Sequence, residues 1–564
     1  MSLDVSQPAL EFKNAIYQKT GVPPERQKVM IKGGMLKDDI DLSILNLKPG
    51  QMLMLIGTVD ELPKAPPDPV TFVEDMTDSQ LASATKKKVG LVNLGNTCYL
   101  NSTLQVLRAI PELQLALSDF TGQMGGADDE ANLTASLRDL FKSLKDTTEP
   151  FPPLAFLSIL RQVAPQFAEM QREGHGFAQQ DAEEVWVRII TALQQSLKGQ
   201  GSSSSNTAAS VERSSRRFVE HYLTGDFTVK RSCSEALSEE PTYSNDSFRV
   251  LQCNISSSTN DMSQGIKDSL NQQIEKNSET LGRIAVYNEE SRINRLPAYL
   301  TIHFVRFYWR REIGKKTKIM RKVRFPIELD VTDFLSDELK SKTRAYRDKV
   351  HGISKEREER ARVRRKAKAK KDEAINSDAT ASTSNANAAA IFAGADTRRP
   401  FDAMAIETYK EKANAPVEKA NAPVEIGKIS GANLGAVIDE IEEAKLREQE
   451  AKELELLLHP DLKVDVGCNP SALYELVGVI THKGAHADGG HYISWVLKED
   501  EAHDMGTSSS SRVSKAPVND SPKEEWYKFD DEKVSVVSKD KITMLSGGGE
   551  DSTAYLLLYR AKRL

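Results

Sequence analysis

This sequence has little cysteine, few aromatic side chains and no long hydrophobic run, and each scarcity excludes a class of protein. Four cysteines among 564 residues are too few for a disulfide scaffold, and none of them stands in a Cys-x-x-Cys zinc pair. The longest apolar stretches, such as 52–56, fall far short of the roughly 20 residues that cross a bilayer. The first residues lack the basic and then apolar segments of a secretory signal. We therefore expect an intracellular protein with reduced thiols and no membrane partner.

Neither sign of charge dominates the chain. Lys and Arg number 76 against 82 Asp and Glu, which gives a net charge of −6. No overall basic field attracts nucleic acid or an anionic membrane. The length predicts roughly three to four domains at about 150 residues each, or fewer domains with long insertions.

The N-terminal segment 1–57 is predicted to be a small α/β unit. Phe12 and Ile16 lie on one helical face, and Gly21 stands where that helix is expected to stop. A strand over 28–32, a Gly33-Gly34 turn and a second strand over 51–56 complete the unit. Its size is near the lower limit for independent folding. A linker over 58–86 follows, and the proline-rich part of it, 63–69, favours an extended spacer.

A long segment of unusual composition, about 355–458, interrupts the rest of the chain. It opens with 355–371, in which ten Lys and Arg accompany three Glu, and continues with Asn- and Ala-rich sequence that includes the tandem repeats 413–419 and 420–426. Its low apolar content predicts disorder or a solvated helix. Nucleic-acid binding by the basic run is the alternative, but no aromatic residue lies between its charges for base stacking. Two serine-rich stretches, 199–205 and 506–511, are predicted to be exposed loops.

Cys98 stands at the start of a predicted helix. Leu100, Leu104 and Leu107 recur with helical spacing after it, and Gly95-Asn96 just before it allow a sharp turn. The unpaired N–H groups and the dipole at a helix N-terminus stabilise a thiolate, which is the nucleophilic form of cysteine. A buried cysteine that only packs in a core remains the alternative on this motif alone.

Two later segments offer partners for such a thiolate. His491 follows a glycine pair and begins a predicted strand, while His482 and His486 nearby are interpreted as structural histidines. The aromatic strand 526–529 ends in Asp530 and Asp531. A cysteine, a histidine and a carboxylate can form a thiolate–imidazolium pair that the carboxylate orients.

These segments together resemble the ubiquitin-specific proteases. Residues 90–102 resemble the cysteine box of that family, 489–496 its histidine box, and 526–531 the segment that supplies its third catalytic residue. The matches 179–184, 296–300 with Arg306-Phe307, and 554–559 occur in the same order as in the family. The resemblance implies an α+β fold, a papain-like hand of thumb, palm and fingers, over 87–562 with the 355–458 insertion inside it. It implies no cofactor and no metal.

The same resemblance implies a role for each site residue. Cys98 is expected to be the nucleophile, His491 its general base, and Asp530 the carboxylate that orients the imidazole, with Asp531 as the alternative. Asn93 is expected to donate its amide to the oxyanion, a position where losing a donor typically costs about 2.7–4 kcal/mol. The expected reaction is hydrolysis of the bond after the C-terminal glycine of ubiquitin, with polyubiquitinated proteins as substrates.

Two further residues are expected to bind substrate. Gln180 and Asp181 would contact the ubiquitin tail, although a carboxylate that caps a helix is the alternative for Asp181. Cys233 and Cys253 are expected to stand unpaired in the fingers, where many relatives bind zinc. Segments 308–318 and 481–490 resemble two loops that block the active site in a proteasome-associated member of the family.

Residues 26–34 resemble the ubiquitin-like domain of that proteasome-associated member, and 72–77 resemble its linker. The first unit is thus expected to be a β-grasp domain that lacks its first strand, which would expose a neighbouring strand edge. This resemblance implies trimming of ubiquitin chains at the regulatory particle of the 26S proteasome, in the cytoplasm, with the nucleus as a further location. A non-catalytic module that binds ubiquitin or the proteasome is the alternative.

Overall fold

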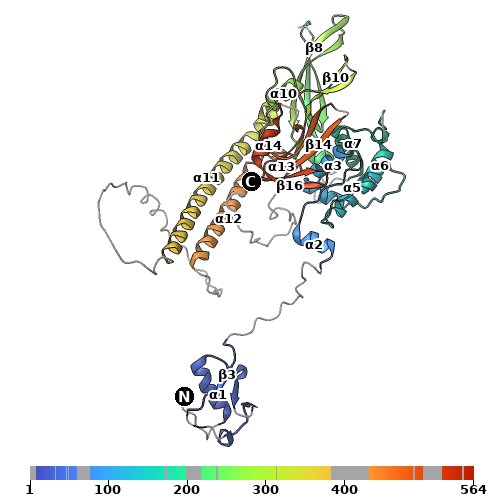
Figure 1. Ribbon diagram of the computed structural model, residues 1–564. Coiled ribbons are helices and arrows are strands. Elements are labelled where there is room, and N and C mark those ends of the chain that lie inside the picture. The colour runs from blue at the N-terminus through green and yellow to red at the C-terminus, as the bar shows by residue number, and fades with distance from the viewer. Residues whose placement is uncertain are drawn as a thin grey trace, which may run out of the picture. The chain divides into compact units, whose positions relative to one another are not determined.

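A computed structural model describes most of the chain, which divides into two compact units with a boundary in the sequence between residues 77 and 78. The described residues are 8–31, 34–45, 48, 50–59, 76–171, 176–197, 217–236, 239–312, 314–382, 431–486, 489–498, 524–548 and 552–563. The predicted proline-rich spacer, both serine-rich loops and the tandem repeats lie outside these residues. Figure 1 shows the two units, the second of which mixes helices and sheets in the expected α+β fashion. None of the described helices is long and apolar enough to span a membrane.

The N-terminal unit packs one helix on a three-stranded sheet. Helix α1 (Ala9–Thr20) ends at Gly21, whose φ of 72° is the left-handed conformation that glycine adopts freely. The strands are β1 (Lys28–Ile31), β2 (Gly34–Met35) and β3 (Met54–Ile56), in the antiparallel order β2-β1-β3. Strand β3 is shorter than the predicted 51–56. In the described part of this unit, β2 and β3 form the two edges of the sheet.

Helices form the thumb of the second unit. They are α2 (Asp78–Thr85), α3 (Cys98–Leu107), α4 (Pro111–Ser118), α5 (Asp129–Ser143), α6 (Leu154–Val163), α7 (Ala182–Ser196) and α9 (Phe218–Tyr222), and all of these except α2 contribute to one large apolar core. Particular residues in the sequence determine where several of these helices begin. Asp128 and Asp181 accept hydrogen bonds from the first free N–H groups of α5 and α7, and a proline occupies the first position of α4.

The palm is a ten-stranded sheet whose principal order is β16-β15-β14-β13-β17-β9-β6. Off this path, β11 and β12 each pair with β13, and β10 pairs with β11. The bounds are β6 (Val250–Asn254), β9 (Tyr299–Val305), β10 (Phe307–Arg310), β11 (Lys315–Lys318), β12 (Glu328–Asp330), β13 (Leu473–His486), β14 (Gly489–Leu497), β15 (Glu525–Asp530), β16 (Lys533–Ser538) and β17 (Thr553–Ala561). Helix α10 (Met262–Leu270) packs on β6, and α13 (Pro460–Val464) and α14 (Lys539–Thr543) are short.

A four-stranded antiparallel sheet forms the fingers, in the order β5-β4-β8-β7. Its strands are β4 (Gly225–Cys233), β5 (Thr242–Phe248), β7 (Asn271–Ser278) and β8 (Arg283–Arg295). Cys233 lies here, in a small apolar cluster with Ala285 and Tyr287. Cys253 was expected beside it, but that expectation is wrong because Cys253 lies on β6 in the palm core. The alternation of buried side chains along β6 places its thiol in the palm.

The described parts of the expected insertion are helical and pack on each other. Helix α11 (Asp337–Ser382) begins before the predicted boundary, and α12 (Gly431–Leu457) returns beside it as a two-helix arm (Figure 1). Arg357 and Arg360 both bind the carboxylate of Glu450, at 2.6 and 2.7 Å, and Arg360 and Arg364 approach Glu443. These arginines of the basic run therefore serve as partners for buried glutamates, which weakens the nucleic-acid alternative.

Candidate active site

The turn before α3 presents Cys98 at the first position of the helix. Gly95 and Asn96 both adopt positive φ, 94° and 55°, as the sharp turn requires. The side-chain oxygen of Asn93 holds this turn by accepting hydrogen bonds from the backbone N–H groups of Gly95 and Thr97. Cys98 is buried, as are Leu100 and Leu104 on the helix behind it. The thiol thus lies at a helix N-terminus, as predicted.

His491 lies against Cys98 although 393 residues separate them in sequence (491 − 98). The hydrogen bond with the Cys98 thiol is the largest influence on the imidazole, and with the Asp530 carboxylate it raises the pKa of His491 to about 9, against the opposing effect of burial. The backbone N–H of Tyr492, the next residue, points at the Cys98 sulfur at 3.5 Å. An imidazole with a raised pKa beside a thiol favours the thiolate–imidazolium pair.

Asp530, at the end of β15, is the third residue of the site after Cys98 and His491. Its Oδ1 lies 2.7 Å from His491 Nε2, and its Oδ2 accepts a hydrogen bond of 2.9 Å from Lys528 Nζ. Burial alone would raise the pKa of this carboxyl, but the hydrogen bonds to His491 and Lys528 outweigh burial and lower it. The carboxylate therefore stays ionised and holds one ring nitrogen, so the other faces the sulfur.

The carboxylate of the next residue, Asp531, binds different partners from that of Asp530. Asp531 adopts a φ of 51°, which turns its side chain away from the imidazole and toward α3. Its Oδ2 accepts a hydrogen bond of 2.8 Å from Asn93 Nδ2, and its Oδ1 accepts one of 2.8 Å from Asn101 Nδ2. In the structure the carboxylate that binds His491 is therefore Asp530, and not the alternative, Asp531. Asn101 was missed in the sequence, because Ser102, Thr103 and Gln105 are also polar on this helix and nothing in the local pattern distinguishes Asn101.

The two predicted ubiquitin contacts lie at the start of α7. The Asp181 carboxylate accepts hydrogen bonds from the Glu183 N–H at 2.8 Å and from the Tyr555 hydroxyl at 2.6 Å. These contacts support the helix-cap interpretation of Asp181 and tie α7 to β17 of the palm. Gln180 precedes the cap and is half-buried. A ubiquitin contact by either residue stays a prediction.

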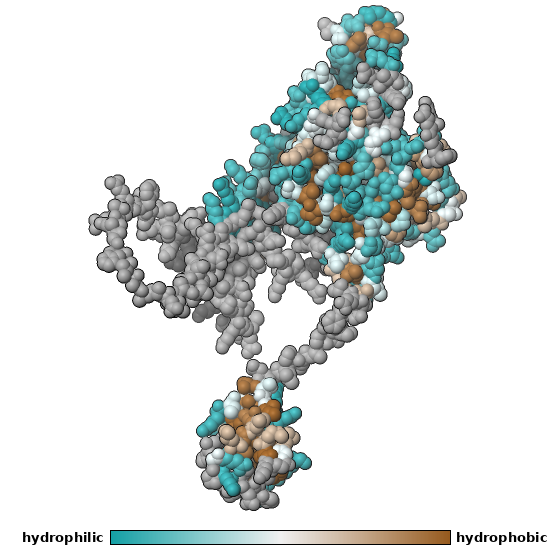
Figure 2. Space-filling model, viewed as in Figure 1, coloured by the Kyte–Doolittle hydropathy of each residue, from teal (hydrophilic) through white to brown (hydrophobic). Residues whose placement is uncertain are grey.

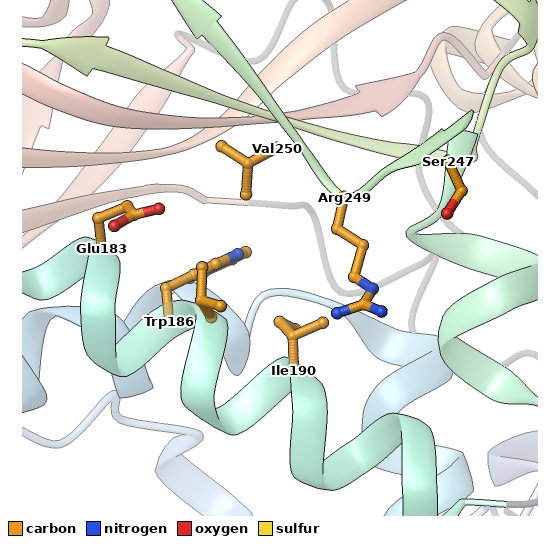
Figure 3. Close-up of a pocket in the computed structure, with 7 residues that line it drawn as sticks. Glu183, Trp186, Ile190, Ser247, Arg249 and Val250 are labelled. Atoms are coloured by element: carbon orange, nitrogen blue, oxygen red, sulfur yellow. The ribbon is translucent and has the colours of Figure 1, made fainter. Parts of the chain in front are cut away.

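The helix α7 also forms one wall of a pocket of about 310 Å³ between the thumb and the base of the fingers. Figure 3 shows Glu183, Trp186 and Ile190 on α7 facing Arg249 and Val250, at the junction of β5 and β6. Burial, and then the charges of Asp181 and Glu184, raises the pKa of Glu183 to about 7. Sequence reasoning gave no role to Glu183 or Arg249, because the residues facing each other across the pocket come from distant segments.

The two segments that resemble blocking loops are mostly strands and lie side by side. The first forms the hairpin of β10 and β11, and the second forms the ends of β13 and β14, with Thr317 paired to His486. Lys318 donates a hydrogen bond of 2.5 Å to the carbonyl of His482. The His482 ring is buried between Phe307 and Tyr492, and burial lowers its pKa to about 3. His482 is thus a neutral packing group, as interpreted from the sequence.

No group of three His, Cys, Asp or Glu side chains within the described ranges is arranged to hold a metal ion. The arrangement of Cys98, His491, Asp530 and Asn93 suits nucleophilic attack on an acyl carbon, with proton transfer by the imidazole.

Comparisons with known proteins agree with this geometry. Residues 89–559 match the ubiquitin carboxyl-terminal hydrolase family, and residues 1–60 match the ubiquitin family. Ubiquitin carboxyl-terminal hydrolase 6 of Schizosaccharomyces pombe is 37% identical over 100% of this chain and 96% of its own length. Ubiquitin carboxyl-terminal hydrolase 6 of Arabidopsis thaliana is 34% identical with the same coverage. Ubiquitin carboxyl-terminal hydrolase 14 of Caenorhabditis elegans is 29% identical over 100% of this chain and 91% of its own length.

Proposed function

The chain belongs to the ubiquitin carboxyl-terminal hydrolase family and is a cysteine-type deubiquitinase with an N-terminal ubiquitin-like domain, and from this premise we propose that it trims ubiquitin chains at the proteasome. The observation that carries the catalytic part is the contact of Cys98, His491 and Asp530. The proteasomal part is supported by the N-terminal domain. We place the enzyme in the cytoplasm, with the nucleus as a further location.

In the proposed reaction the Cys98 thiolate attacks the carbonyl carbon of the last ubiquitin residue. The oxyanion that forms accepts a hydrogen bond from Asn93, which keeps a second amide hydrogen beside the one given to Asp531. The His491 imidazolium gives its proton to the leaving amine as the C–N bond breaks, which leaves a thioester. Neutral His491 then takes a proton from water, the hydroxide adds to the thioester, and the Cys98 thiolate leaves.

We place the globular part of ubiquitin in the hollow that the thumb, palm and fingers surround. The pocket between α7 and the base of the fingers would contribute to this surface, with Trp186 and Val187 beside polar Glu183 and Arg249. A mixed lining of this kind is typical of recognition surfaces. Gln180 and Asp181, at the start of α7, would line the path of the ubiquitin tail. The paired strands β10–β11 and β13–β14 would open to admit it.

The ubiquitin-like domain carries an exposed row of methionines across its sheet. Met30 on β1 is paired with Met35 on β2 and with Met54 on β3, so the three side chains lie on one face. They are 42%, 49% and 65% exposed, whereas Val29 on the opposite face is buried. Figure 2 shows apolar residues gathered on the visible surface of this domain. Exposed apolar patches mark interaction sites, and methionine adapts to varied partners, so this row is our proposed proteasome contact.

One experiment tests both parts. Hydrolysis of a ubiquitin–fluorophore amide is measured with and without purified 26S proteasomes for the full chain and three variants. We expect wild-type turnover that proteasomes increase, no turnover by Cys98→Ser, and an unchanged basal rate without proteasome stimulation for Met30→Lys. Met52→Lys, on an exposed methionine of the same domain outside the row, is the matched control. Turnover by Cys98→Ser would overturn the catalytic assignment, and full stimulation of Met30→Lys would overturn only the docking assignment.

A further inference from the structure

The turn that precedes Cys98 is also held by a segment far along the chain. Asn96 Nδ2 donates a hydrogen bond of 3.0 Å to the carbonyl of Phe177, which lies 81 residues later. Asn96 adopts a φ of 55°, a left-handed conformation that residues other than glycine seldom adopt, so this turn depends on contacts that hold it. The Phe177 carbonyl therefore helps to fix the backbone two residues before the thiol.

Phe177 is in turn fixed by Arg161, near the end of α6. The guanidinium carbon of Arg161 lies 3.4 Å from the centre of the Phe177 ring, which is a close cation–π contact. Phe177 also pairs with Met170 in a short antiparallel bridge, and the next N–H, of Ala178, donates a hydrogen bond of 2.8 Å to the carbonyl of Glu169. Because ring and carbonyl belong to one residue, the stack on Arg161 also fixes where the carbonyl that binds Asn96 lies.

The same guanidinium reaches the residue that follows Cys98. Arg161 Nε donates a hydrogen bond of 3.3 Å to the carbonyl of Phe167, and the Phe167 ring stacks on Tyr99 with 6.1 Å between ring centres and 14° between ring planes. Both aromatic residues are buried. Burial raises the pKa of Tyr99 to about 12, and the positive charge of Arg161 opposes that rise, so guanidinium and phenol are close neighbours.

One side chain of α6 thus touches both flanks of Cys98, through Asn96 on one side and Tyr99 on the other. Arginine suits this position because its planar guanidinium can stack on a ring with its face and donate a hydrogen bond from its edge. The attack of a nucleophile requires close alignment with its base and its substrate, and a displacement of about 1 Å caused by a distant mutation can cost about 10²-fold in rate. A contact that fixes both flanks of the thiol therefore bears on the reaction itself.

We propose that Arg161 is a positioning residue for the Cys98 thiol, and this inference rests on the proposed role of Cys98 as the nucleophile. Arg161 touches no reacting atom. It acts through Phe177 and Asn96 on the turn before the thiol, and through its bond to the Phe167 carbonyl on the start of α3. Its removal should slow the attack by Cys98 and leave the affinity for ubiquitin unchanged.

The test measures covalent labelling of the full chain by ubiquitin that carries a C-terminal vinyl sulfone, to which the Cys98 thiolate adds. The maximal labelling rate reports the attack, and the probe concentration that gives half of that rate reports binding. We expect Arg161→Met to lower the maximal rate at least tenfold and to change the half-saturating concentration less than twofold. Phe177→Leu, which removes the ring, should also slow the attack, whereas Phe177→Tyr keeps the ring and should restore it.

The double variant tests whether the two residues act as one unit. Arg161→Met combined with Phe177→Leu should label no more slowly than Arg161→Met alone, because the first change already removes the stacking contact. A loss equal to the product of the two single losses would show that Arg161 and Phe177 act independently, and it would overturn the proposal.

A second arginine of the thumb provides the matched control. Arg138 also lies over a phenylalanine ring, that of Phe120, at 6.0 Å, and it donates hydrogen bonds to the carbonyls of Phe120 and Gly122 rather than to residues around Cys98. Arg138→Met should label at the wild-type rate, and the melting temperature of each variant shows how far it is destabilised.

Equal losses of labelling rate in Arg138→Met and Arg161→Met would reduce the effect to general destabilisation of the thumb and refute the proposal. A wild-type maximal rate in Arg161→Met, or a change in the half-saturating concentration alone, would refute it as well. Each of these results leaves the assignment of Cys98 intact. Failure of the wild type to react at all would instead overturn that assignment, and this inference with it.

Discussion

Asp531 Oδ2 lies 2.8 Å from Asn93 Nδ2, and this hydrogen bond joins the end of a palm strand to the turn that precedes Cys98. The adjacent Asp530 instead binds His491. Two consecutive carboxylates thus serve the two halves of the site: one orients the imidazole and the other orients the proposed oxyanion donor. The positive φ of Asp531 produces this division, because it sends the second side chain in a different direction from the first.

We expect Asp531→Asn to lower kcat at least tenfold with little change in KM. Asparagine tolerates the positive φ, but it replaces one of the two acceptor oxygens that hold Asn93 and Asn101 with a donor. Asn93→Ala, which removes the donor itself, should cost about 10²–10³-fold in kcat. Steady-state hydrolysis of ubiquitin–fluorophore checks both, with exposed Glu532→Gln as the neighbouring control. A change in KM alone would show that these residues bind substrate rather than support the transition state.

The activity of the wild type should persist through neutral pH and decline as pH rises through about 9. That decline reports loss of the His491 proton, which the Cys98 thiol and then Asp530 hold at a raised pKa. Asp530→Asn removes one of the two favourable contacts, so the pKa of His491 falls and the alkaline limb moves to lower pH. We also expect at least a tenfold loss of kcat from the misoriented ring.

The pH dependence of kcat/KM for wild type and Asp530→Asn measures this shift, and exposed Asp540→Asn serves as the control. An alkaline limb that stays in place in Asp530→Asn would mean that the carboxylate does not act through His491.

Glu183→Gln should stabilise the protein more at high pH than at low pH. Burial and the neighbouring carboxylates raise the pKa of Glu183 in the folded protein to about 7, above its usual 4.5. The folded state therefore prefers the protonated form, and the stability this provides is fully present below about pH 4.5 and is lost as pH rises through 7. Glutamine mimics the neutral form at every pH.

The measurement is the melting temperature of both proteins between pH 5.5 and 8.5. The difference between Glu183→Gln and wild type should grow with pH, whereas exposed Glu149→Gln should show a constant difference. If the difference in melting temperature between Glu183→Gln and wild type became smaller with rising pH, the direction of this pKa shift would be contradicted.

Glu450→Ala should loosen the two-helix arm without changing catalysis. The Glu450 side chain is 10% exposed and binds both Arg357 and Arg360, so its removal leaves two guanidinium groups without that partner. We expect amide exchange in α12 to accelerate roughly tenfold or more, which corresponds to about 1.4 kcal/mol of local stability.

Hydrogen exchange of the full chain checks this, together with ubiquitin–fluorophore turnover. Glu448→Ala is the matched control, because Glu448 is exposed and its ion pair, with Lys452, lies within α12. Equal exchange in both variants would show that the arginine contacts do not hold the arm together.

Local chemistry carried much of the prediction. The i, i+4, i+7 leucines after Cys98 predicted α3 and Gly21 predicted the end of α1, whereas β14 begins at Gly489, two residues before the predicted start at His491. The extent of the arm was harder to predict. Helix α11 extends well upstream of the basic run, and its arginines looked solvated because their glutamate partners lie about ninety residues away in α12.

The sequence by itself determined the family and the α+β composition, and it predicted Cys98 and His491 as nucleophile and base, since these depend on short motifs in fixed order. Only the tertiary structure decided which carboxylate binds His491, that Asp181 caps α7 and binds Tyr555, and that Cys253 lies in the palm. Each of those outcomes depends on a backbone direction or on a neighbour from a distant segment, and the sequence does not encode such distances locally.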